Sequence, residues 1–247
     1  MSLLNRVESP GPGLLARMSW PGWRGVVAGV LGVLGVLVAA APGWAAPPLS
    51  PQRQAEVDRA VIEYASGHFD VARRAFEALS RQHVAMAEFN LAAMHLRGEV
   101  PKPDRALARR LLERSARGGF VLAQTMLGRS LENGEFGSRE LKAAHDWYEM
   151  AARRGDVDAQ VSMGTAYYLG RGRPKDPALA AQWYRQAANG GDVGAMYLLA
   201  SMYEQGDGVE RDLRLARYWY DVAAQNGDEA APGKVRELDG RMRQDPA

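Results

Sequence analysis

A single 36-residue period between residues 83 and 228 constrains the fold more than any other feature of this chain. Six kinds of position recur in four successive copies without a shift in register. They are an alanine (Ala87, Ala123, Ala159, Ala195), a glycine (Gly98, Gly134, Gly170, Gly206), an acid (Asp104, Glu140, Asp176, Asp212), two further alanines (Ala108, Ala144, Ala180, Ala216 and Ala116, Ala152, Ala188, Ala224) and a closing glycine (Gly119, Gly155, Gly191, Gly227). A period of this length indicates one supersecondary unit stacked several times.

The residue pattern of each copy predicts a helix, a turn and a second helix. Residues 85–97 are predicted to form the first helix of the first copy, because Ala87, Leu91 and His95 fall on one face. The glycine that follows can adopt the left-handed conformation that ends a helix. The acid at 104 and its equivalents are predicted to cap the second helix, and Asp156, Asp192 and Asp228 to cap the next first helix. The pattern predicts an all-α fold, a right-handed superhelical solenoid of helix–turn–helix repeats.

The three tryptophans that follow residue 45 occupy one position of the repeat, as Trp147, Trp183 and Trp219, and each precedes a tyrosine. An aromatic platform for a ligand is one interpretation. Filling the gap between stacked hairpins is the other, and we favour it because the same aromatic in successive units suits a structural repeat.

At these residues the chain resembles the Sel-1-like repeat family, a branch of the tetratricopeptide superfamily. The third copy reads AQVSMGTAYYLGRGRPKDPALAAQWYRQAANGGD, and the fourth differs mainly at Ala200, where the family usually has glycine. The first copy is the weakest, with His95 in place of a tyrosine. The resemblance covers about residues 85–228. It implies a scaffold that binds a protein or peptide on a concave surface lined by the first helices.

The superfamily's inner-face positions correspond to residues 89, 93, 96 and 97 of the first copy and to their equivalents in the later copies. These positions differ between copies, as expected of a surface that selects one partner. Phe89, Arg129, Tyr168 and Tyr197 are the expected anchors, because aromatic and arginine side chains dominate binding hot spots. The full set of expected partner-binding residues is Phe89, Arg97, Arg129, Glu132, Tyr168, Tyr197 and Glu204.

The two ends of the array are predicted to be different. Residues 55–82 resemble a shorter tetratricopeptide-type hairpin, in phase with the array because Ala72 lies 36 residues before Ala108. Residues 83–228 contain the four repeats. Residues 229–247 are predicted to form a capping helix and a tail, with the polar outer face that a stack of repeats needs.

The N-terminal segment has the pattern of a Sec-type signal peptide. Arg17 and Arg24 precede an apolar run over residues 25–41, and Gly43 and Ala45 fit the −3 and −1 positions of a cleavage site. We expect cleavage after Ala45, with Met18 as an alternative start, followed by a Pro-rich linker over 46–54. An uncleaved membrane anchor is the alternative. The expected location is periplasmic or secreted.

Charge gives one further candidate site. Residues 46–247 carry 28 basic and 28 acidic side chains, so no net field attracts nucleic acid. Five arginines nevertheless crowd one predicted helix; they are Arg105, Arg109, Arg110, Arg114 and Arg117. A solvated face balanced by neighbouring acids and a basic patch for an acidic partner are both possible. Residues 46–130 have a net charge of +4 and residues 131–247 of −4, which could orient a partner or drive head-to-tail self-association.

No catalytic pattern is evident. The chain has no cysteine, its four histidines lack metal-ligand spacing, and no nucleophile motif occurs in a suitable context. We therefore expect no cofactor, no metal and no enzymatic activity. The family has a cysteine-rich branch described as binding or hydrolysing β-lactams, but that branch pairs cysteines in every repeat. The expected function is a non-catalytic scaffold of the bacterial cell envelope; the alternative is a structural factor associated with peptidoglycan or exopolysaccharide machinery.

Overall fold

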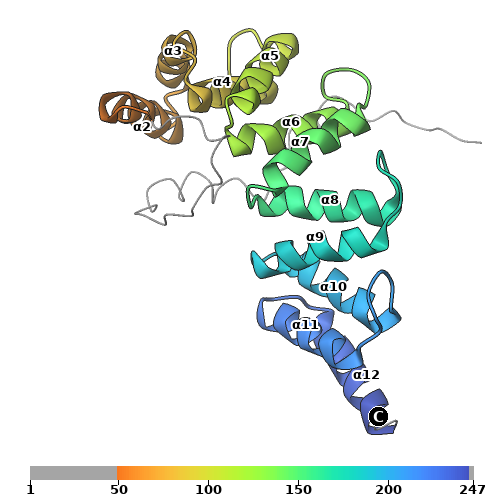
Figure 1. The fold of residues 1–247 in the computed structure, drawn as a ribbon. Helices are drawn as coiled ribbons and strands as arrows, with labels where there is room; N and C mark the ends of the chain where they lie inside the picture. Colours follow the sequence, from red (N-terminus) through yellow and green to blue (C-terminus); the bar gives the residue numbers. More distant parts are fainter. Residues whose placement is uncertain (1–48, 245–247) are drawn as a thin grey trace, which may run out of the picture. The chain divides into compact units, whose positions relative to one another are not determined.

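The computed structural model describes residues 49–244, and every regular element in this range is an α-helix (Figure 1). The helices are α2 (Pro51–Ala65), α3 (Phe69–Ser80), α4 (Ala85–Arg97), α5 (Arg105–Arg117), α6 (Val121–Asn133), α7 (Leu141–Ala152), α8 (Val157–Leu169), α9 (Pro177–Asn189), α10 (Val193–Gln205), α11 (Leu213–Gln225) and α12 (Ala231–Gln244). The closest packing lies within the pairs α4/α5, α6/α7, α8/α9 and α10/α11, and each pair packs on the next. The predicted all-α repeat solenoid is confirmed.

Helix ends follow the predicted chemistry with one exception. Gly98 and its equivalents have φ between 68° and 75°, a conformation that glycine adopts without steric penalty. Asp104, Asp176 and Asp212 each accept hydrogen bonds from main-chain N–H groups in the first turn of the second helix. Glu140 does not cap its helix, because its longer side chain pairs instead with Arg109, at 2.8 Å.

Asp156, Asp192 and Asp228 accept first-turn N–H bonds as predicted for the first helices of the next units and for α12. An interior hydrogen bond also joins successive units. The Gln124 side chain donates to the carbonyl of Ala116, and Gln160 donates to the carbonyl of Ala152. Each bond ties a first helix to the last turn of the second helix before it.

Alanine and tyrosine fill the core. The alanines of the period are buried, apart from the half-buried Ala224, and the tyrosine that follows each tryptophan is almost inaccessible at positions 148, 184 and 220. Gly164 makes room for one of these rings, since a Cβ there would lie 2.7 Å from Tyr184. Trp183 is buried and Trp147 and Trp219 are half-buried, which favours the packing interpretation of the tryptophan position.

The structure modifies the expected boundary at the N-terminal end of the array and agrees with the one at the C-terminal end. Helix α2 begins at Pro51, and the Ser50 side chain accepts a hydrogen bond from the Arg53 N–H. The last four residues of the segment 46–54, which was expected to be a linker, therefore belong to this helix. Helix α12 occupies the region expected to cap the array and buries Leu238. Within residues 49–244, no helix is both long and apolar enough to cross a membrane. The expected signal segment and its cleavage site lie outside the described residues.

Candidate partner-binding surface

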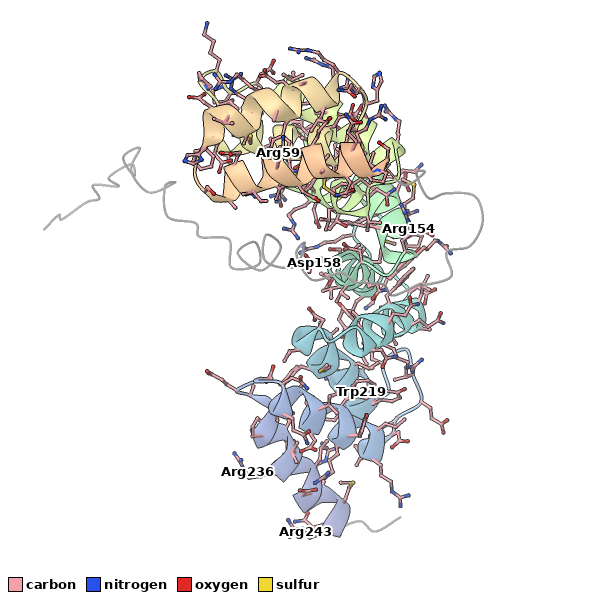
Figure 2. All side chains as sticks on the ribbon, turned by 90° about the vertical axis from the view of Figure 1, so that its left-hand side faces the viewer. Arg59, Arg154, Asp158, Trp219, Arg236 and Arg243 are labelled. Carbon is pink, nitrogen blue, oxygen red and sulfur yellow. The ribbon has the colours of Figure 1, made fainter. Side chains whose placement is uncertain are left out.

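The solvent face of the first helices forms a row of side chains spaced i, i+4, i+7 and i+11, a spacing that keeps residues on one side of a helix. We call this set the first-helix row. Its members are exposed or half-buried apart from Ala93. They are Met86, Asn90, Ala93 and Arg97 on α4; Leu122, Met126, Arg129 and Asn133 on α6; Asp158, Ser162, Thr165 and Leu169 on α8; and Gly194, Leu198, Ser201 and Gln205 on α10. Figure 2 labels Asp158 on α8.

Part of the expected inner face belongs to this row and part to the core. Arg97 and its equivalents are exposed in all four units. Phe89, by contrast, is only 4% exposed, and its ring packs edge-on against Phe120 with centroids 5.2 Å apart. Its side chain therefore stabilises the stack and offers little surface to a partner in this structure.

The two expected glutamates bind groups of the chain itself. Glu132 accepts a hydrogen bond from the buried Tyr148 hydroxyl at 3.0 Å. Glu204 occupies the same repeat position as Glu132, two repeats further along the chain, and accepts the equivalent hydrogen bond from the Tyr220 hydroxyl at 3.0 Å. Burial, followed by the charge and hydrogen bond of Glu132, raises the pKa of Tyr148. Both carboxylates therefore position the second helix of their own unit.

Glu204 has two additional partners on α12. Its carboxylate lies 2.7 Å from the Arg241 guanidinium and 3.4 Å from the Lys234 ammonium. Burial by itself would raise the pKa of Glu204, but the Tyr220 hydrogen bond and the two cations together outweigh it and lower that pKa. This residue fastens the C-terminal helix to the array.

The other expected residues are only partly committed to internal contacts. Arg129 on α6 pairs with Asp158 on α8 at 3.2 Å, which links the row across two units. The half-buried Tyr168 has the Lys175 ammonium 6.0 Å from its ring centroid. Tyr197 is half-buried and packs edge-on against Tyr220.

Sequence reasoning missed the apolar residues of the row. Leu122 is 37% exposed, Leu169 48% and Leu198 39%, so three successive first helices each present a leucine to solvent. The leucines occupy three different positions of the row, so no column of the repeat reveals them. A search for the face opposite the buried column, with spacing i, i+4, i+7 and i+11, would have found them.

The arginine cluster on α5 is largely balanced by acids. Arg109 pairs with Glu113 and Glu140, at 2.9 and 2.8 Å, and Arg117 shares Glu113. Arg114 lies 2.9 Å from the buried carboxylate of Glu88. Arg105 donates to the main-chain carbonyl of residue 135, and Arg110 is exposed. These pairs support the interpretation of a charge-compensated face.

The histidines and acids do not assemble a reactive centre in the described range. His95 accepts a hydrogen bond from the Asp104 N–H, which joins α4 to the start of α5. His145 is 2% exposed, and burial lowers its pKa. No group of three or more potential metal ligands occurs among residues 49–244. The surface that these residues build is suited to binding by contact and charge.

Comparison with known proteins places the chain in a family. The model of the Sel1 repeat matches residues 85–120, 121–156, 157–192 and 193–228, more than half of the sequence. No curated protein matches.

Two solved structures of bacterial repeat proteins are similar to this chain over 75% of its length. One is a protective antigen of uropathogenic Escherichia coli strains that displays an SLR fold, with 29% identity and a TM-score of 0.70. The other is a Sel1 repeat protein from Oxalobacter formigenes, with 28% identity and a TM-score of 0.69. The match covers 41% of the first relative and 55% of the second, so the chain spans about half the length of these proteins. The four matched repeats and the fold together show that this chain belongs to the Sel1-repeat family.

Proposed function

We propose that this chain is a non-catalytic scaffold of the bacterial cell envelope that binds one protein partner through the first-helix row. Sel1-repeat proteins are generally protein-interaction scaffolds. The observation that carries the proposal is the leucine that each of α6, α8 and α10 exposes on the same side of the array. A leucine side chain exposed to water contributes no burial of apolar area, whereas a partner that covers the side chain removes that area from water, which is favourable.

The contrast between core and row supports a selective surface. The buried positions repeat as alanine, glycine and tyrosine, because every unit must stack in the same way. The last position of the row changes from Arg97 to Asn133, Leu169 and Gln205. A partner docked along the row would therefore meet a different side chain at each unit, which fixes its register.

The proposed location rests on the N-terminal segment. Arg17 and Arg24, the apolar run that follows them and the small residues before position 46 have the pattern of an exported protein. Fractionation of cells that express the full chain tests the location directly: recovery in the cytoplasm with residues 1–45 still attached would contradict it.

Site-specific photo-crosslinking in intact cells tests the binding surface. A photoreactive residue replaces Leu122, Leu169 or Leu198 in turn, and matched controls carry it at Leu215 or Tyr218, which are 40% and 56% exposed on α11. We expect all three row positions to yield an adduct with the same protein and the two α11 positions to yield none. Equal labelling from row and control positions would contradict the proposal. Adducts with cell-wall polymer in place of protein would favour the structural alternative.

A further inference from the structure

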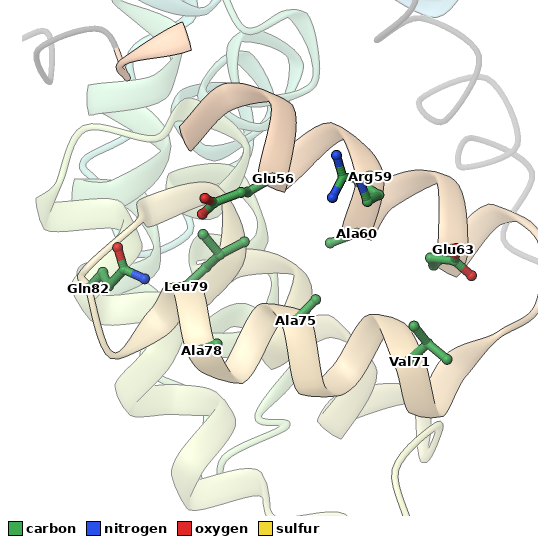
Figure 3. Close-up of a pocket in the computed structure, with 9 residues that line it drawn as sticks. All are labelled: Glu56, Arg59, Ala60, Glu63, Val71, Ala75, Ala78, Leu79 and Gln82. Carbon is green, nitrogen blue, oxygen red and sulfur yellow. The ribbon is translucent and has the colours of Figure 1, made fainter. Parts of the chain in front are cut away.

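The N-terminal hairpin carries an open hollow between its two helices (Figure 3). The hollow has a volume of about 260 Å³. Ala60 of α2 and Val71, Ala75, Ala78 and Leu79 of α3 form its apolar wall. The rim is polar, and its members are Glu56, Arg59, Glu63 and Gln82.

The repeat explains why the hollow exists. Ala75 lies 36 residues before Leu111 and so occupies the position at which the later units carry Trp147, Trp183 and Trp219. Those large side chains are buried or half-buried in the later units, whereas the small Ala75 leaves the hollow open.

The hollow faces the place where a preceding unit would stack. Ala78 lies 36 residues before Arg114. The Arg114 side chain reaches back to the Ser80 hydroxyl of the preceding hairpin, at 3.2 Å. The same side of α3 therefore has the geometry of a stacking surface, and within residues 49–244 no hairpin precedes it.

The two ends of the array expose different kinds of side chain. At the C-terminal end, α12 exposes Arg236 and Arg243 (Figure 2) and also Glu237. At the N-terminal end the hairpin exposes Ile62 and Val71, by 54% and 44%. A stack of repeats requires a polar outer face at each end; at the N-terminal end, exposed polar residues such as Arg53 and Arg59 lie on the same hairpin as these exposed apolar ones. The charged C-terminal cap is a poor match for an apolar hollow, which disfavours head-to-tail stacking of copies.

The rim charges suit pairing of the hairpin with itself. Glu56, Arg59 and Glu63 lie along one side of α2, with the cation between two acids. When two such helices cross in antiparallel fashion about a two-fold axis that passes between Glu56 and Arg59, the arginine of each copy meets Glu56 of the other, and both pairs form at once. Arg59 makes no ion pair with any other residue in the described range, so its guanidinium is available for this contact.

We propose that two copies of this chain form a closed dimer through their α2/α3 hairpins, with the two hollows and the rims of residues 56–63 facing each other. Because this surface is separate from the first-helix row, the dimer would present two rows to partners. The proposal does not depend on what the row binds.

The absence of cysteine from the sequence allows a clean crosslinking test. Single cysteines replace Ile62 or Val71 in the full chain, and matched controls carry one at Asp158 or Arg236, which are also exposed. A short bismaleimide is added to cells and to the purified protein. We expect dimer bands from positions 62 and 71 and none from 158 or 236. Absence of dimer from 62 and 71, or equal yield from all four positions, would overturn the proposal.

Charge inversion tests the pairing itself by sedimentation equilibrium. Arg59→Glu makes the rim wholly acidic and should weaken the dimer at least tenfold. Inverting all three rim charges (Glu56→Arg, Arg59→Glu, Glu63→Arg) should restore the dimer, whereas the inverted chain should not pair with the original one. Far-UV circular dichroism verifies that each variant is folded. A monomeric original chain, whether the hollow is then covered by residues 1–48 or by another protein, would refute the proposal, as would failure of the triple inversion to restore pairing.

Discussion

The contacts of Glu204 predict how strongly the C-terminal helix is held to the array. Glu204→Gln keeps an acceptor for the Tyr220 hydroxyl but removes the charge that faces Lys234 and Arg241. Hydrogen bonds to charged groups contribute about 1.5–3 kcal/mol each. The two cations are 32% and 36% exposed, so solvent screens the interaction. The neutral side chain also avoids the desolvation penalty. We therefore expect a net loss of about 1–2 kcal/mol, a factor of roughly 5–30 in the docking equilibrium of α12.

Glu132→Gln is the matched control, because Glu132 occupies the same repeat position and accepts from Tyr148 without ion pairs to α12. We expect it to change stability by less than about 0.5 kcal/mol, since the amide oxygen still accepts the bond. Hydrogen exchange measured by mass spectrometry gives the comparison. Exchange in α12 should accelerate 5–30-fold in Glu204→Gln while α4–α7 remain protected. Equal effects of the two substitutions on α12 would refute the assignment of Glu204 as its anchor.

The same carboxylate sets a pH dependence. Since the pKa of Glu204 in the folded chain is below its ordinary value, the unfolded state takes up the proton first. The stabilisation of α12 is therefore complete above the ordinary glutamate pKa of about 4.3 and is lost as the pH falls through the lower folded value. Exchange of α12 in the original chain should accelerate over this window, and Glu204→Gln should remove that dependence.

Four further substitutions test the packing by urea unfolding. His83 has φ 58° where the later units have glycine, so His83→Gly should stabilise the fold by about 0.5–1 kcal/mol; destabilisation would contradict the strain. Gly164→Ala places a Cβ 2.7 Å from Tyr184 and should destabilise by about 1–2 kcal/mol after its helix propensity is counted. Gly240→Ala on α12, where a Cβ would meet nothing within 4 Å, should stabilise slightly, and equal effects of the two substitutions would refute the clash. Because burial lowers the pKa of His145, the original chain should lose stability as the pH falls below about 6.5, and His145→Asn should lose less; parallel pH profiles would contradict this.

The fold could be predicted from the sequence because each recurring residue has one stereochemical role. Gly98 ends a helix, Asp104 caps the next one, and the alanines allow two helices to approach closely. The prediction that Glu140 caps its helix was wrong, because the choice between capping and pairing with Arg109 depends on a contact with a residue 31 positions away in the sequence. The start of α2 was expected at residue 55 and lies at Pro51, because the sequence Ser50-Pro51 is compatible both with a linker and with the start of a helix.

The binding surface could be predicted only in part. Which side of a first helix faces solvent depends on how neighbouring units pack, so Phe89 was expected to be exposed and is buried against Phe120. The role of Glu204 depends on Lys234 and Arg241 of α12; a capping helix was expected there, but no pattern in the sequence pairs these cations with Glu204. The exposed leucines vary in position from unit to unit, and a search for repeated columns therefore passes over them.

The affinity of the crosslinked partner for the leucine variant tests the central claim most directly. Replacing Leu122, Leu169 and Leu198 by serine removes apolar surface worth about 1 kcal/mol per residue, or roughly 100-fold in Kd for the three together. The control replaces Leu215 and Tyr218 by serine, which lie on α11 outside the row. We predict that calorimetry will show the 100-fold loss for the triple variant and an unchanged Kd for the control. An unchanged Kd for a folded triple variant would contradict the assignment of the first-helix row as the partner-binding surface.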